Sequence, residues 1–119
     1  MADILVVDDA DFIRSLLKDI LSNNGHRVIG EAVDGVEAVL KYRELKPDLV
    51  TMDIVMPKTT GIEAVKSIRS EDPNARIVMI SALGQQKLVM ESIMAGAKDF
   101  IVKPFNEKTI IEIINKALL

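Results

Sequence analysis

Five polar residues that could do chemistry each follow a short apolar run of this 119-residue chain. They are Asp8, Asp9, Asp53, Ser81 and Lys103. Three carboxylates in one place would repel one another and raise each other's pKa, so such a cluster normally needs a cation. Carboxylate oxygens suit Mg²⁺, which takes one or two of them and keeps several waters. With an ammonium and a hydroxyl beside it, such a set is typical of phosphoryl transfer onto a carboxylate nucleophile.

Each of these residues also has an ordinary explanation when it is considered alone. Asp8 or Asp9 could cap the helix that follows, and Asp53 could be a loop residue. Ser81 could belong to a turn, and Lys103 could be a surface charge. The functional interpretation therefore depends on whether the fold brings the five side chains together.

Five apolar runs, short and rich in β-branched residues, predict strands that are covered on both faces. They span residues 4–7, 27–29, 49–52, 77–80 and 100–102. After each run, apolar residues recur at the spacing of a helix. These helical segments are 12–21, 36–42, 62–68, 88–93 and 110–118.

The predicted helices have recognisable beginnings and apolar stripes. Asp34, with Glu37 three residues later, has the pattern of a capping box, and Asn106 is the expected cap of the last helix. We expect the apolar stripe of each helix to face the sheet. The first stripe contains Phe12 and Leu16, and the second contains Val36 and Leu40.

Strict alternation of strands and helices predicts an α/β fold, a doubly wound five-stranded parallel sheet with helices on both faces. The expected strand order is 2-1-3-4-5, the flavodoxin-like (βα)5 arrangement, in a single domain over residues 1–119. Ligands bind such sheets at the carboxyl ends of the strands, where the strand order reverses. For this order the point lies between the first and third strands, so we expect Asp8, Asp9 and Asp53 to meet there.

Composition excludes several other classes of protein. Fifteen basic and eighteen acidic residues give a net charge of −3, and no basic cluster of the kind that binds nucleic acid is present. The absence of cysteine excludes disulfides, thiolate zinc sites and a cysteine nucleophile. No segment has the length of a signal peptide or a membrane span, so we expect a cytoplasmic protein. The single histidine, His26, is expected at the far end of the sheet as an ordinary surface residue.

The order and spacing of several short motifs resemble those of the receiver domain of two-component response regulators, over essentially the whole chain. The motifs are Val6-Val7-Asp8-Asp9, Met52-Asp53-Ile54-Val55-Met56-Pro57 with Gly61, Ser81-Ala82, Ala95-Gly96-Ala97 and Lys103-Pro104-Phe105. Within that family the chain is most similar to the stand-alone chemotaxis receivers of the CheY type. The stretch Ser81-Ala82-Leu83-Gly84-Gln85-Gln86 is similar to members outside the enteric group.

The resemblance implies a role for each residue of the acidic cluster. Asp53 would be the phosphoacceptor. Asp9 and Asp53, with the backbone carbonyl of Val55, would hold one Mg²⁺ directly, while Asp8 would act largely through water. Lys103 would contact the phosphoryl oxygens. The peptide bond between Lys103 and Pro104 would be cis, which is plausible because the second residue is proline.

The same resemblance implies a conformational switch. Ser81 would move to the phosphoryl group and Phe100 would turn inward behind it, which would change the face formed by the fourth helix, fifth strand and fifth helix. Phe100 stands where the enteric pattern has Tyr, so the hydroxyl is absent. Val55 and Leu83 would flank the phosphoryl group. Both are apolar and cannot orient a water, so they predict slow hydrolysis.

Two questions stay open at this point. Phe100 could instead be an ordinary core aromatic. Met90 and Met94, four residues apart, could belong to the core or could form an adaptable exposed pair at a docking surface.

The implied partners are a CheA-like histidine kinase as phosphodonor, a FliM-like motor switch protein or an archaeal adaptor, and a phosphatase. The protein would be a monomer that binds no nucleic acid or membrane. Beyond self-catalysed phosphoryl transfer and autodephosphorylation it would not be an enzyme. Alternatives are a receiver of a sporulation-type phosphorelay, a Mg²⁺-dependent aspartyl-phosphate phosphatase and a flavodoxin-like electron carrier. Such a phosphatase would be expected to carry an acidic residue two positions after the nucleophile, where this chain has Val55.

Overall fold

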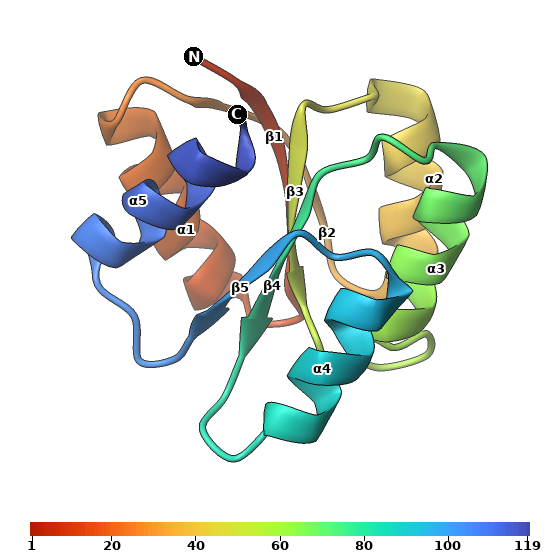
Figure 1. Cartoon of the computed structure of the whole chain (residues 1–119). Coiled ribbons are helices and arrows are strands. Elements are labelled where there is room, and N and C mark those ends of the chain that lie inside the picture. The colour runs from red at the N-terminus through yellow and green to blue at the C-terminus, as the bar shows by residue number, and fades with distance from the viewer.

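Five strands and five helices alternate along the chain in the computed structural model, which describes all residues 1–119 (Figure 1). The elements are β1 (Asp3–Val7), α1 (Asp11–Asn23), β2 (Arg27–Ala32), α2 (Gly35–Leu45), β3 (Leu49–Asp53), α3 (Gly61–Glu71), β4 (Ile77–Ser81), α4 (Gln86–Ala95), β5 (Asp99–Val102) and α5 (Glu107–Ala117). All strand pairs are parallel, and the order is β2-β1-β3-β4-β5. The predicted fold class and strand order are confirmed.

Two helical layers enclose the sheet. Helices α1 and α5 cover one face, and α2, α3 and α4 cover the other (Figure 1). A separate apolar core lies under each layer, built on one side around residues such as Leu17 and Ile114 and on the other around Val65 and Ile68. No helix is long and apolar enough to cross a membrane.

Burial differs between the central and edge strands. Every residue of β3 and β4 is buried, as the sequence predicted. The expectation of two covered faces was wrong for β2 and β5, whose side chains are partly exposed, because each has a neighbour on one edge only. The site below lies on the buried central strands.

The predicted helix caps are present. The Asp34 carboxylate accepts the backbone N–H of Glu37 at 2.8 Å, and the Asn106 side chain accepts that of Thr109 at 2.9 Å. The sequence analysis missed a third cap, since Thr60 accepts the N–H of Glu63 at the start of α3. These bonds satisfy N–H groups that the first turn of a helix leaves free.

Four apolar residues that we expected to face the sheet are exposed. They are Phe12, Leu16, Val36 and Leu40. Apolar residues occupy more of the circumference of α1 and α2 than the face that touches the sheet. On α2 the buried residues are Gly35, Ala38 and Tyr42, and Gly35 packs closely against Thr59 in the loop after β3.

The prediction that His26 is an ordinary surface residue was wrong. It lies at the amino-terminal end of the strands, but it is buried. Its Nδ1 accepts the backbone N–H of Ala2, and its Nε2 lies 3.0 Å from the side-chain oxygen of Asn115. The imidazole therefore ties α5 to the start of β1, far from the acidic cluster.

Candidate functional site

Three carboxylates meet at the carboxyl ends of β1 and β3. Asp8 follows β1, and Asp53 is the last residue of the neighbouring strand β3. One carboxylate oxygen from each of Asp8, Asp9 and Asp53 lies within 4.8 Å of the others. Asp8 and Asp53 are buried, while Asp9 is exposed. The topology thus places the three residues where the sequence predicted.

The backbone and side chain of Asp8 are held at several points. Its N–H donates to the carbonyl of Ala32 at 3.1 Å, and its Oδ1 accepts the N–H of Ala10 at 2.9 Å. Asp8 does not cap α1, whose capping position is Ala10 and has no side-chain cap. The second oxygen, Oδ2, is buried without a hydrogen-bond partner. An unsatisfied buried carboxylate oxygen is costly, and a cation would satisfy it.

Asp53 carries the strongest electrostatic perturbation of the cluster. Burial, together with the charges of Asp8 and Asp9, raises the pKa of Asp53 to about 6, against the opposing charge of Lys103. A carboxylate in this state is stabilised by a divalent cation held beside it. The orphaned oxygen of Asp8 and the raised pKa of Asp53 both fit Mg²⁺, whose preferred ligands are oxygens.

Lys103 brings a positive charge to the cluster from the end of β5. Its Nζ lies 3.5 Å from Asp8 Oδ2 and 3.9 Å from Asp53 Oδ1. Its backbone N–H donates to the carbonyl of Ser81 at 2.7 Å, which joins the ends of β4 and β5. The peptide bond between Lys103 and Pro104 is cis.

Gly61 lets the start of α3 approach the end of β3. A Cβ at this position would lie 2.2 Å from the carbonyl oxygen of Asp53, so only glycine fits. The N–H of Gly61 donates to the carbonyl of Ile54 at 2.8 Å. This contact fixes the turn that follows Asp53. Val55 in that turn is 55% exposed, and Leu83 after β4 is 77% exposed.

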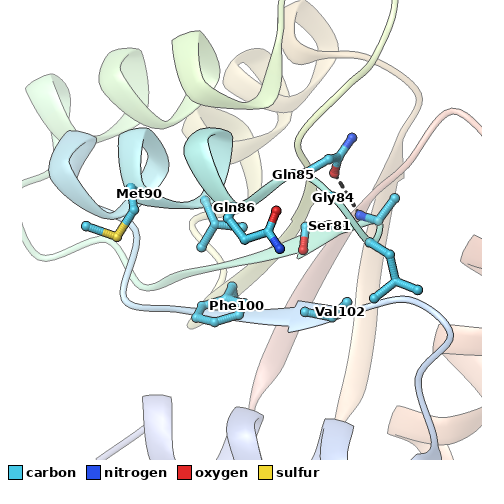
Figure 2. Close-up of a pocket in the computed structure, with 10 residues that line it drawn as sticks. Ser81, Gly84, Gln85, Gln86, Met90, Phe100 and Val102 are labelled. Atoms are coloured by element: carbon cyan, nitrogen blue, oxygen red, sulfur yellow. Dashed lines mark hydrogen bonds between the residues drawn. The ribbon is translucent and has the colours of Figure 1, made fainter.

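A largely apolar hollow of about 290 Å³ opens beside Ser81 (Figure 2). Ser81, Gln86 and Phe100 border it, and Met90 closes one end. The Ser81 hydroxyl is buried and has no hydrogen-bond partner, while Phe100 is 38% exposed. Phe100 is therefore not an ordinary core aromatic in this structure.

Two features of this region were open or unrecognised in the sequence. Met90 and Met94 are 61% and 84% exposed, which settles their position on the surface of α4. The side chain of Gln85 accepts the backbone N–H of Ala82 at 2.7 Å, as the dashed line in Figure 2 marks. Nothing in the sequence distinguishes Gln85 from Gln86 for this contact.

Sequence reasoning also missed Arg14, a buried residue of α1 that contacts the backbone of Asp8. No signal in the sequence marks it clearly, because Arg14 lies at the edge of the apolar stripe predicted for residues 12–21. Only the packing of α1 places it on the buried face beside Ile13 and Leu17. A charged residue on such a face is almost always paired.

The arrangement can place an ionised carboxylate, a divalent cation, an ammonium and a hydroxyl around one anionic group. Bound Mg²⁺ would neutralise the repulsion between the carboxylates and the incoming phosphoryl oxygens. Asp53 feels the charges of Asp8, Asp9 and Lys103 together. The site has no histidine or cysteine.

Comparison with known proteins gives a consistent match. Residues 4–115 match the family model described as the response regulator receiver domain. The chain is 58% identical over 113 residues to the chemotaxis protein CheY of Thermotoga maritima, covering 95% of this chain and 94% of the relative. It is 57% identical over 115 residues to CheY of Bacillus subtilis, covering 97% and 96% respectively. A crystal structure of a CheX-CheY-BeF3-Mg²⁺ complex from Borrelia burgdorferi contains a chain with a TM-score of 0.94 and 40% identity, covering 98% of this chain and 89% of that one.

Proposed function

The chain belongs to the response regulator receiver domain family, and on that premise we propose that it accepts a phosphoryl group on Asp53 in a Mg²⁺-dependent reaction. The observation that carries the proposal is the geometry around Asp53. A buried carboxylate is held within 4.8 Å of two others and 3.9 Å from the Lys103 ammonium.

The chemical step forms one bond and breaks one bond. An Oδ atom of Asp53 attacks phosphorus of a phosphohistidine, and the P–N bond breaks, so the leaving imidazole keeps the electron pair and is then protonated. Asp9, Asp53 and the Val55 carbonyl would hold Mg²⁺, with Asp8 acting through water. Lys103 Nζ is placed to meet a phosphoryl oxygen, since it already faces Asp53 Oδ1. The product is an acyl phosphate, which water hydrolyses.

Phosphorylation would then bias the region around Ser81. The new dianion offers oxygens that the unpartnered Ser81 hydroxyl can bond. The hollow beside Ser81 gives the Phe100 ring space to move inward (Figure 2). A change at Phe100 would alter the surface that Met90 and Met94 share with β5, which is how a local charge becomes a signal for a partner.

The proposed setting is chemotaxis, with a CheA-like histidine kinase as donor and a FliM-like motor switch protein or archaeal adaptor as target. High identity to two CheY proteins supports this choice over a sporulation-type phosphorelay. The Borrelia burgdorferi relative was solved together with CheX, BeF3 and Mg²⁺. This supports a Mg²⁺ site in the present chain and a further protein partner. We expect that partner to be a phosphatase.

Mass spectrometry after incubation with acetyl phosphate tests the core of the proposal. The protein with Mg²⁺ should gain one phosphoryl group, while Asp53→Asn and a sample with EDTA should gain none. Asp19→Asn, which alters an exposed aspartate of α1, is the matched control and should behave as wild type. Uptake by Asp53→Asn at the wild-type rate would disprove the assignment. Comparison of rates with a CheA-like kinase and a sporulation-type kinase then tests the pathway.

A further inference from the structure

Arg14 is a charged residue on the buried face of α1, with only 9% of its surface exposed. Charged side chains are almost never buried to this degree unless they are paired. The guanidinium is bonded through all three of its nitrogens. Nη1 donates to the backbone carbonyl of Asp8 at 2.6 Å, Nε donates to Glu31 at 3.0 Å, and Nη2 pairs with Asp11.

The acidic partners of Arg14 are themselves fixed. Glu31 lies on β2 and also accepts a hydrogen bond from Lys18 at 2.9 Å. Hydrogen bonds from Lys18 and Arg14 lower the pKa of Glu31, so the carboxylate stays ionised. Asp11 lies in the first turn of α1. The guanidinium therefore joins β2 and α1 to the turn between Asp8 and Ala10.

Three of the four polar groups of Asp8 have hydrogen-bond partners. The N–H bonds to Ala32, Oδ1 accepts the N–H of Ala10, and the carbonyl accepts from Arg14. Only Oδ2 has no hydrogen-bond partner, and it faces Lys103 and the acidic cluster. Arg14 thus supplies the one side-chain hydrogen bond to the backbone of Asp8.

We infer that Arg14 is a positioning residue for the metal site. By holding the carbonyl of Asp8 it fixes the turn that aims Asp8 Oδ2 and the Asp9 carboxylate at the cluster. The inference rests on the proposed Mg²⁺ site and adds a residue that does not touch the ion. Groups that orient ligands in this way are worth about tenfold or more in metal affinity.

Charge and positioning predict opposite results when Arg14 is removed. If Arg14 acted only through its charge, its loss would make the site more negative and Mg²⁺ would bind more tightly. If it positions the Asp8 turn, its loss lets the ligands move and Mg²⁺ binds more weakly. The sign of the change in affinity therefore separates the two explanations.

The experiment measures Mg²⁺ affinity of the purified chain by isothermal titration calorimetry, without a phosphodonor. Arg14→Ala should raise the Mg²⁺ Kd by about tenfold. Arg14→Lys should give an intermediate Kd, because lysine keeps a donor but loses the planar fork. Ile114→Val removes a buried methyl from α5, away from the site, and should leave the Kd within about twofold of wild type although it lowers stability.

A second measurement follows the turn itself in the absence of Mg²⁺. Amide hydrogen exchange at Asp9 and Ala10 should become faster in Arg14→Ala and unchanged in Ile114→Val. An unchanged or tighter Mg²⁺ Kd in Arg14→Ala would overturn the inference. If Arg14→Ala fails to fold, a wild-type Mg²⁺ Kd in Arg14→Lys would overturn the inference instead.

Asp9→Asn distinguishes failure of this inference from failure of the proposed function. If Asp9→Asn binds Mg²⁺ as wild type does, the metal site itself is wrong, and the positioning role falls with it. If Asp9→Asn loses Mg²⁺ while Arg14→Ala keeps it, the site stands and only the role of Arg14 is wrong.

Discussion

Replacement of Asp53 by asparagine should make the folded protein more stable in the absence of Mg²⁺. Burial and the charges of Asp8 and Asp9 raise the pKa of Asp53 from 3.8 to about 6. That is a difference of about two pKa units, and each unit is worth about 1.4 kcal/mol. Ionised Asp53 therefore costs the folded state at most about 3 kcal/mol at neutral pH, and screening by solvent lowers this figure. Asparagine has nearly the same shape and carries no charge, so Asp53→Asn should recover most of that free energy.

The pH dependence has a definite sign. Below about pH 4, Asp53 is protonated in both the folded and unfolded chains, so it makes no difference to stability. Between about pH 4 and 6 the unfolded chain ionises while the folded chain keeps the proton, so the free energy of unfolding falls as pH rises. Above about pH 6 the full cost is present. The advantage of Asp53→Asn should therefore grow from near zero at pH 4 to its full value, at most about 3 kcal/mol, at pH 7.5.

Urea unfolding of wild type and Asp53→Asn across this pH range, with EDTA present, measures the difference. Asp19→Asn is the control, since Asp19 is exposed and should show no such gain. Added Mg²⁺ should stabilise wild type and leave Asp53→Asn almost unchanged. A variant that is no more stable than wild type at pH 7.5, or a gain that persists at pH 4, would refute the electrostatic reasoning.

Three further predictions concern the switch, the lifetime of the phosphoryl group and the far end of the sheet. Ser81→Ala should accept phosphoryl groups but, once phosphorylated, bind its target more weakly than wild type in a pull-down or titration, because the orphaned hydroxyl is gone. Val55→Asn combined with Leu83→Glu should speed the decay of the phosphorylated protein after the donor is removed, because polar groups can orient the attacking water; both positions are exposed, so the fold should tolerate the change. His26→Ala should lower the free energy of unfolding by about 1–3 kcal/mol, because it leaves the buried N–H of Ala2 without an acceptor, and should leave phosphorylation unchanged.

The strand order and the meeting of the carboxylates could be predicted because they follow from short-range patterns. Alternating apolar runs and helical segments restrict the chain to very few topologies, and in the one expected the ends of β1 and β3 are neighbours. Asp8 and Asp53 needed no further information to be placed together. The caps at Asp34 and Asn106 were predictable for the same reason, since a cap depends on residues three positions apart.

The predictions from the sequence that failed concern contacts between distant parts of the chain. The partners of His26 lie 24 and 89 residues away, so nothing near His26 in the sequence shows that it is buried. Which apolar side of α1 faces the sheet depends on how the helix packs, and this leaves Phe12 exposed and Arg14 buried. Arg14 of α1 pairs with Glu31, which lies on β2, 17 residues further along the chain.

The acidic cluster also explains why a stable fold retains an unfavourable site. Asp8 keeps a buried oxygen without a hydrogen-bond partner, and Asp53 is held beside two other carboxylates. Any isosteric neutral residue at position 53 would lower this repulsion, so the stability of the fold gives no reason to keep an aspartate there. The clustered carboxylates attract a dication or the Lys103 ammonium, because a cation binds more strongly where negative charge is concentrated and shielded from water. Electrostatic cost of this kind is typical of functional sites, and it agrees with the proposal that the cluster binds a cation and receives a phosphoryl group.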